Sequence, residues 1–140
     1  MNYWICIINK ENWNIISSNL IWGVKLNQKK KFEQIEPGDK IIFYLKGGIF
    51  KGIFESNSKM FESYEKLFKP HPTWNRNEIF PLRIKIKSIA SSTLETNLIE
   101  ILGKLSFIKK KKNWAAYFFR SIIKINKEDY LVIKNSMRKK

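Results

Sequence analysis

The chain has one cysteine and one histidine among its 140 residues, so it can form neither an internal disulfide nor a closed zinc site of Cys and His ligands. Cys6 lies in an apolar run, where we expect a buried and unreactive thiol. His71 stands between two prolines, which favours an exposed loop. Only two aspartates, Asp39 and Asp129, are present, which argues against a paired-aspartate metal site. We therefore expect no metal, no cofactor and no catalytic residues.

Long apolar stretches are also missing. No run approaches the roughly 18 residues that span a bilayer, and the N-terminus lacks a basic segment followed by an apolar leader. These absences predict a cytoplasmic protein without a membrane partner. No segment reads as a linker and no internal repeat is visible, so we expect one domain over residues 1–140.

The most informative feature of the composition is its charge. Lysine and arginine number 27 against 12 acidic residues, which gives a formal net charge of +15. Such an excess favours a polyanionic partner, above all nucleic acid, because neutralised phosphates release their counterions. Anionic membrane surfaces are a weaker alternative. Heavy use of Lys, Ile and Asn beside only four arginines also fits an A/T-rich genome that imposes basic residues without any such partner.

The first half of the chain contains clear local signals. Tyr3–Ile8 is a continuous apolar run typical of a buried strand, and Asn9 can cap a helix over residues 10–17. A turn at residues 36–39 precedes two predicted strands, residues 40–46 and Ile49–Ser56, joined by the two-residue loop Gly47-Gly48.

The second half is less regular. Residues 80–89 alternate strictly, so Leu82, Ile84 and Ile86 should face the core, and Arg83 and Lys85 should face outward. The other expected elements are helical turns within residues 60–78, a helix over residues 94–102, an extended piece at 105–108, a helix or irregular segment over 113–124, and a last turn near 128–133. Strands with helices between them predict an α+β fold, a small mixed β-barrel with short helices packed around it.

Eight short motifs carry a resemblance across nearly the whole chain. In order they are Tyr3-Trp4-Ile5-Cys6-Ile7, Glu11-Asn12-Trp13, Ile21-Trp22-Gly23-Val24, Pro37-Gly38-Asp39, Phe43-Tyr44, Gly52-Ile53-Phe54-Glu55, Phe80-Pro81-Leu82-Arg83-Ile84 and Leu105-Ser106-Phe107-Ile108. Each is weak alone, but in this order they resemble the archaeal-type EVE domains. The resemblance implies a PUA-like barrel related to YTH domains, which binds nucleic acid through a flipped, chemically modified base.

The resemblance also implies a base pocket. Trp22, at the end of an element, would form one wall of an aromatic cage, and the backbone of Gly23 or Val24 would bond an exocyclic amine. Asn12 and, with it, Asn9 would contact the base edge. The second wall should come from the later loop, which offers Phe61, Tyr64, Phe68 and Trp74, with Tyr64 as the first choice.

Phosphates would be bound by two sets of cations. They are Arg83 and Lys85 on the alternating strand, and Lys109, Lys110, Lys111 and Lys112, although a lysine run is often only a solvated surface. We therefore expect a non-catalytic reader that accepts a modified, methylated base of DNA or RNA. The alternative is an accessory specificity module of a restriction or RNA-modification assembly that needs a protein partner.

Overall fold

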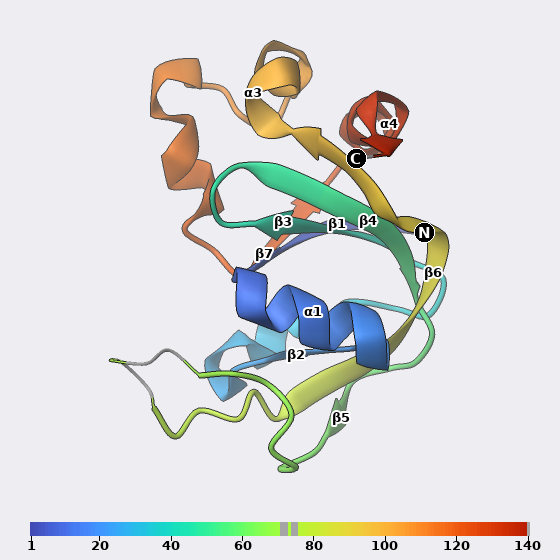
Figure 1. Cartoon of the computed structure of the whole chain (residues 1–140), viewed down its shortest axis with the longest axis vertical. Coiled ribbons are helices and arrows are strands. Elements are labelled where there is room, and N and C mark those ends of the chain that lie inside the picture. The colour runs from blue at the N-terminus through green and yellow to red at the C-terminus, as the bar shows by residue number, and fades with distance from the viewer. Residues whose placement is uncertain (71–72, 74–75, 140) are drawn as a thin grey trace.

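The computed structural model describes residues 1–70, 73 and 76–139, with only the backbone of residues 91–93 (Figure 1). His71 and Trp74 lie outside the described residues. The elements in chain order are β1 (Tyr3–Ile8), α1 (Lys10–Asn19), β2 (Ile21–Val24), the 3-10 helix η1 (Leu26–Gln28), α2 (Lys29–Phe32), β3 (Lys40–Leu45), β4 (Ile49–Ser56), β5 (Phe61–Glu62), β6 (Leu82–Asn97), α3 (Leu98–Ile101), η2 (Leu102–Lys104), η3 (Lys111–Phe118), β7 (Ile122–Ile125), α4 (Lys127–Ser136) and β8 (Arg138–Lys139).

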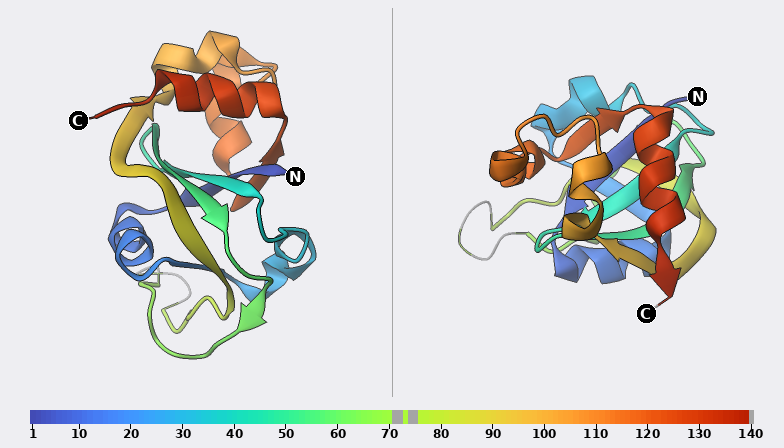
Figure 2. Two further views of the ribbon diagram at one scale, coloured as in Figure 1. Left: turned by 90° about the vertical axis from the view of Figure 1, so that its right-hand side faces the viewer. Right: turned by 90° about the horizontal axis from the view of Figure 1, so that it is seen from above.

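The strands form one mixed sheet in the order β2-β6-β4-β3-β1-β7, and β5 and β8 add to β6. In the part of the chain that the structure describes, β1 and β3 are the only strands that pair in parallel. The sheet curls into a half-barrel, because the 16-residue β6 bends and pairs with β2 near its start and with β4 along its length (Figures 1 and 2). Strands β2 and β7 are the two ends of this order, so a seam stays open between them.

The sheet buries apolar side chains on both faces. Strand β1 shows this directly, since Trp4, Cys6 and Ile8 join one buried cluster while Ile5 and Ile7 join the other. Helix α1 covers the first cluster with Trp13 and Ile16, and α3 and α4 cover the second on the opposite side of the sheet (Figure 1). The expected buried thiol is confirmed, and burial raises the pKa of Cys6.

Helix α1 begins where its cap predicts. The Asn9 side-chain oxygen accepts the Asn12 backbone N–H at 2.8 Å, which satisfies one of the free donors at the helix start. The helix ends at Leu20, which adopts the left-handed conformation (φ 55°) and donates its N–H to the Ile16 carbonyl. The helix therefore runs slightly longer than residues 10–17.

The predicted hairpin is confirmed with a longer loop. Leu45 pairs with Ile49, so three residues, Lys46, Gly47 and Gly48, connect the strands. Both glycines have positive φ, at 116° and 103°, a region that other residues rarely adopt. Lys46 is the first residue of this loop.

The predicted boundaries in the second half of the chain are less accurate. Strand β6 continues to Asn97 because its later residues pair with β4 and β8, so the expected helix over residues 94–102 shrinks to α3 and η2. Within residues 60–78 the described part holds β5 and no helix. Residues 105–108 form no strand, and the segment from 113 to 124 divides into η3 and β7. The expected last turn is the full helix α4.

Among the described residues, no helix combines the length and the apolar character needed to cross a membrane.

Candidate functional site

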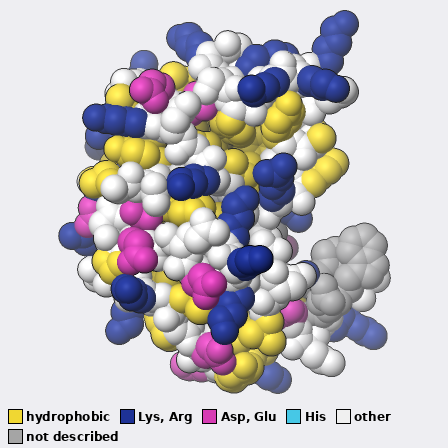
Figure 3. All heavy atoms as spheres, turned by 180° about the vertical axis from the view of Figure 1, so that it is seen from behind, with side chains coloured by type: hydrophobic (Ala, Val, Ile, Leu, Met, Phe, Trp, Pro, Cys, Tyr) yellow, Lys and Arg dark blue, Asp and Glu magenta, His cyan; other side chains and the backbone are white. Residues whose placement is uncertain are grey.

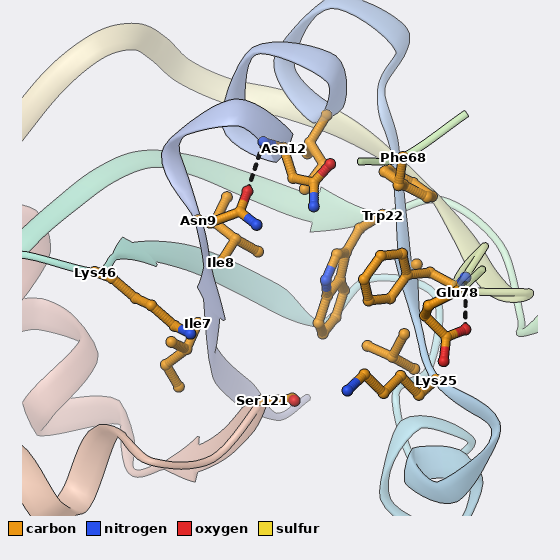
Figure 4. A pocket seen from close by; sticks show the side chains of 14 residues that line it. Ile7, Ile8, Asn9, Asn12, Trp22, Lys25, Lys46, Phe68, Glu78 and Ser121 are labelled. Atoms are coloured by element: carbon orange, nitrogen blue, oxygen red, sulfur yellow. Dashed lines mark hydrogen bonds between the residues drawn. The ribbon is translucent and has the colours of Figure 1, made fainter. Parts of the chain in front are cut away.

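A cavity of about 330 Å³ occupies the open seam of the half-barrel (Figure 4). Trp22, Gly23 and Val24 of β2 line one side. On the other side lie Ile7, Ile8 and Ser121, where Ile7 donates its N–H to the Ser121 carbonyl at 2.9 Å. The volume falls within the range typical of small-ligand pockets, and it lies where the sheet fails to close.

Trp22 forms the deep wall of this pocket. Only 1% of the residue is exposed, because its ring packs edge-on against Phe32 at 4.8 Å and against Phe43 at 5.8 Å between centroids. The ring therefore lines the pocket, as expected for a wall, while its packing is that of a core residue. Trp22 serves the core and the pocket together.

The other aromatic walls are Phe68 and Phe80, whose rings meet at 89° with centroids 6.0 Å apart. Tyr64, the first choice for this role, does not line the pocket. It is 60% exposed, its hydroxyl lies 3.2 Å from Glu62, and it borders a separate, more open hollow beside Leu26. The choice of Tyr64 is corrected to Phe68, because the chain after β5 directs Phe68 inward and leaves Tyr64 at the surface.

Gly23 permits the close approach of this loop to β2. A side chain at this position would place Cβ 2.7 Å from the Phe68 ring and 2.8 Å from the Phe80 carbonyl oxygen. Its backbone has a second role. Ile86 donates its N–H to the Leu20 carbonyl, so Leu20 and Ile86 form a hydrogen-bonded pair of the antiparallel ladder. Such pairs alternate along the strand with pairs that make no hydrogen bond to each other, and Gly23 and Arg83 form one of these. The N–H and C=O of Gly23 therefore point to the free edge of β2, away from β6.

Asn12 ties the loop to helix α1. Its amide nitrogen donates to the Lys69 carbonyl at 3.0 Å and its oxygen accepts the Lys69 N–H at 2.8 Å. Asn12 lines the pocket as predicted, and one N–H and one oxygen lone pair of its amide are engaged by Lys69, the neighbour of Phe68. The amide is therefore oriented by Lys69, and its second N–H and second lone pair are the sites left for a ligand.

Arg83 does not face solvent, contrary to the alternating pattern. It is 2% exposed, because the loop folds over this face of β6. Its guanidinium donates to the carbonyls of Glu65, Ile79 and Phe80 and to the Ser63 hydroxyl, and it lies 5.2 Å from the Phe68 ring centroid. Arg83 therefore shapes the loop, and its assignment to phosphate is corrected.

Asn9 and Glu78 add polar groups to the pocket (Figure 4). The Asn9 oxygen is used by the helix cap, which leaves its Nδ2 as a donor. One oxygen of Glu78 accepts the Phe80 N–H at 3.0 Å. Phe80 itself has φ 53°, a left-handed conformation that costs a phenylalanine roughly 1 kcal/mol and concentrates at functional sites.

Two lysines approach the mouth of the pocket from opposite sides. Lys25 follows β2 and Lys46 belongs to the hairpin loop, and neither has an ion pair within the described ranges. A further cation, Arg120, directly precedes Ser121, which lines the pocket. Arg120 lies near Lys31, because the pKa of Lys31 is lowered by the burial of Lys31 and by the positive charge of Arg120. Lys and Arg side chains are spread along the middle of the face seen from behind, while most carboxylates lie toward its left side and lower end (Figure 3).

The other predicted cations lie outside the pocket lining. Lys85, Lys109, Lys110 and Lys112 are exposed. The ammonium group of Lys111 instead donates to the carbonyls of Leu105 and Ile108, so this lysine stabilises its own turn.

Both aspartates are buried in structural networks. Asp39 accepts from Trp4 Nε1 and the backbone of Asn2 and Glu36, each at 3.0 Å. Asp129 accepts the N–H and hydroxyl of Ser106 and the Phe107 N–H. No group of three or more potential metal ligands occurs in the part of the chain that the structure describes.

Sequence reasoning missed Lys25, Lys46, Glu78 and Phe80 as pocket residues. Lys25 and Lys46 could have been found from their positions directly after β2 and in the hairpin loop, where strands end at the seam. Glu78 and Phe80 had no signal of their own, because the loop conformation that places them depends on Arg83.

The curled mixed sheet is the PUA-like fold that EVE and YTH domains share, as solved structures show. The human THYN1 protein in complex with 5-methylcytosine-containing DNA superposes with a TM-score of 0.61 at 14% identity, covering 93% of this chain and 94% of that one. The Mmi1 YTH domain in complex with RNA gives a TM-score of 0.62 at 16% identity, covering 99% of this chain and 84% of that one.

The chain belongs to the EVE domain family, which matches residues 2–136. It is 35% identical over 145 aligned positions to the UPF0310 protein PH1033 of Pyrococcus horikoshii, covering 96% of this chain and 97% of the relative. The resemblance inferred from the eight motifs is confirmed, and so is the PUA-like fold.

Proposed function

We propose that this chain is a non-catalytic reader of nucleic acid that takes one flipped-out, modified base into the seam pocket. The observation that carries the proposal is the pocket itself, with three aromatic rings, free hydrogen-bonding groups and, at its mouth, two lysines that have no ion pair among the described residues. The complexes of THYN1 with 5-methylcytosine-containing DNA and of the Mmi1 YTH domain with RNA support it.

The walls suit a base in size and chemistry. Stacking on an aromatic ring contributes about 1–3 kcal/mol per base, and the rings of Phe68, Phe80 and Trp22 line the pocket. Asn9 Nδ2 and the free backbone groups of Gly23 can bond the base edge that extrusion exposes. An apolar wall also accommodates a methyl group without desolvating a polar one.

Lys25 and Lys46 are placed to hold the phosphates on either side of an inserted base. Such contacts position a strand and carry no sequence information. Lys109, Lys110 and Lys112, which are exposed, would add a second contact to the backbone farther along the strand.

The proposal is tested by anisotropy titration of the purified chain with labelled single strands that carry, or lack, one modified base. Phe68→Leu keeps an apolar side chain in the loop but removes the stacking face, so affinity for the preferred base should fall about tenfold. Tyr64→Leu is the matched control and should bind like the wild type. Equal losses in both variants, or tight binding that needs an added protein partner, would contradict a self-sufficient reader.

A further inference from the structure

Phe119 is the most exposed large apolar residue among those that the structure describes, at 83%. It follows the buried Phe118 at the end of η3 and lies in the bend that leads into β7. A single exposed ring is common on protein surfaces and indicates no function by itself. The position of this ring and the charges beside it give it one.

The bend places Phe119 at the rim of the seam pocket. Ser121 lines the pocket, and its carbonyl accepts an N–H of β1 at 2.9 Å, which fastens the bend to the end of that strand. On the other side of the same strand end, Lys46 donates its backbone N–H to the Ile8 carbonyl at 3.2 Å, and Ser121 lies between Lys46 and Lys25 (Figure 4). Phe119 is two residues from Ser121, and a chain spans at most about 7 Å in two residues. The ring is therefore within reach of the nucleotide next to one whose base enters the pocket.

Two cations stand beside the ring without a counter-ion. Arg120 is exposed, and it lies near Lys31 of α2, because burial and the positive charge of Arg120 both lower the pKa of Lys31. Neither residue has an ion pair in the described part of the chain. Helix α2 belongs to the facing side of the seam, since Phe32 packs against Trp22 of β2. Two like charges that repel each other favour an anion between them, and a phosphate accepts hydrogen bonds from both.

We propose that these three residues form a second nucleotide subsite at the rim: the base next to the extruded one stacks on Phe119, and its phosphate lies between Arg120 and Lys31. The inference rests on the proposed function. A flat ring beside two uncompensated cations matches a nucleotide, whereas an apolar protein surface would leave both charges without a partner. Every base has a face that stacks, so the subsite should accept any neighbouring base.

The stacking part is tested with labelled single strands that carry one central 5-methylcytosine or N6-methyladenine. The neighbour on the 5′ or on the 3′ side is either intact or abasic, and affinities are measured by anisotropy. On one of the two sides, the intact neighbour should improve the affinity of the wild type about tenfold more than that of Phe119→Ala. That side gives the direction in which the strand crosses the rim.

The variants separate stacking from folding. Phe119→Ala changes an exposed residue and should unfold at the wild-type temperature, and Phe119→Trp keeps a stacking face and should retain the benefit of the intact neighbour. Ile99→Ala is the matched control, because Ile99 is an apolar residue on α3 that is 63% exposed and lies outside the pocket lining. It should bind every strand like the wild type.

The phosphate part is tested by salt dependence. Arg120→Gln and Lys31→Gln should each reduce the slope of log affinity against log salt by about 0.7, because each removes one contact to a single strand. A neutral methylphosphonate in place of the neighbouring phosphate should lower the wild-type slope and leave the slope of either variant unchanged.

Three results would overturn the subsite and leave the reader function standing. They are an intact neighbour that benefits Phe119→Ala as much as the wild type, an equal loss in Ile99→Ala, and self-association of the chain that Phe119→Ala abolishes while strand affinity stays the same. Failure of the wild type to bind any of the strands would overturn both proposals.

Discussion

The side-chain amide of Asn12 and the backbone of Lys69 exchange two hydrogen bonds, which fasten the loop that carries Phe68 to helix α1. Asn12 is buried, so neither bond has water as a ready substitute. The pocket wall thus depends on a contact between residues 57 positions apart.

Asn12→Ala should remove both bonds and leave the Lys69 backbone groups without partners. We expect the free energy of unfolding to fall by about 1–3 kcal/mol and the affinity for the preferred base to fall with it, because Phe68 is no longer held. Urea unfolding and anisotropy titration measure the two effects. Asn14→Ala, on the exposed side of the same helix, should change neither; a similar loss there would assign the effect to the helix itself.

Arg83 gives a second prediction, about a positive charge that should not contact phosphate. Arg83→Lys keeps the charge but cannot reach the loop carbonyls with one ammonium group, so we expect at least about 2 kcal/mol of lost stability. Lys85→Gln, two residues along β6, should leave stability unchanged. An Arg83→Lys protein that is fully stable yet binds nucleic acid poorly would return Arg83 to the phosphate-binding set.

The lysines at the mouth of the pocket predict a salt dependence. Each neutralised phosphate of a single strand contributes about 0.7 to the slope of log affinity against log salt, so Lys25→Gln with Lys46→Gln should reduce the slope by about 1.4. Modified and unmodified strands should be affected alike. Lys127→Gln with Lys134→Gln removes the same charge from α4, on the other side of the sheet, and an equal change in slope there would refute the assignment.

Trp22 is expected to behave as a core residue. Trp22→Ala should cost about 3–5 kcal/mol of stability, as should Trp4→Ala, because both residues are almost fully buried and truncation leaves a cavity. Thermal unfolding of the two variants beside the wild type checks this. Wild-type stability of Trp22→Ala would show that its ring does not support the core. Trp22→Phe should fold and bind the base.

The sequence predicted elements whose signals are local. The Asn9 cap, the buried run of β1 and the hairpin glycines each act within a few residues, and all three are confirmed. Arg83 shows why other predictions failed: strand alternation directs its side chain away from the core, but only the folded loop determines whether water or carbonyl groups meet it there.

The residue that forms the second pocket wall was also beyond local prediction, because it too depends on the folded loop. Tyr64 and Phe68 are both aromatic and lie four residues apart, and no periodic pattern in their segment fixes which one turns inward. That choice depends on Asn12, Arg83 and the space above Gly23, all of them distant in the sequence.

The most direct test of the seam pocket is a crystal structure of the chain with a short single strand that contains one 5-methylcytosine or N6-methyladenine. The structure predicts that the extruded base lies against Trp22 between Phe68 and Phe80, with Glu78 and Asn9 at its edge and Lys25 and Lys46 near the flanking phosphates. A strand bound along Lys109, Lys110 and Lys112, with no base in the seam, would contradict the account.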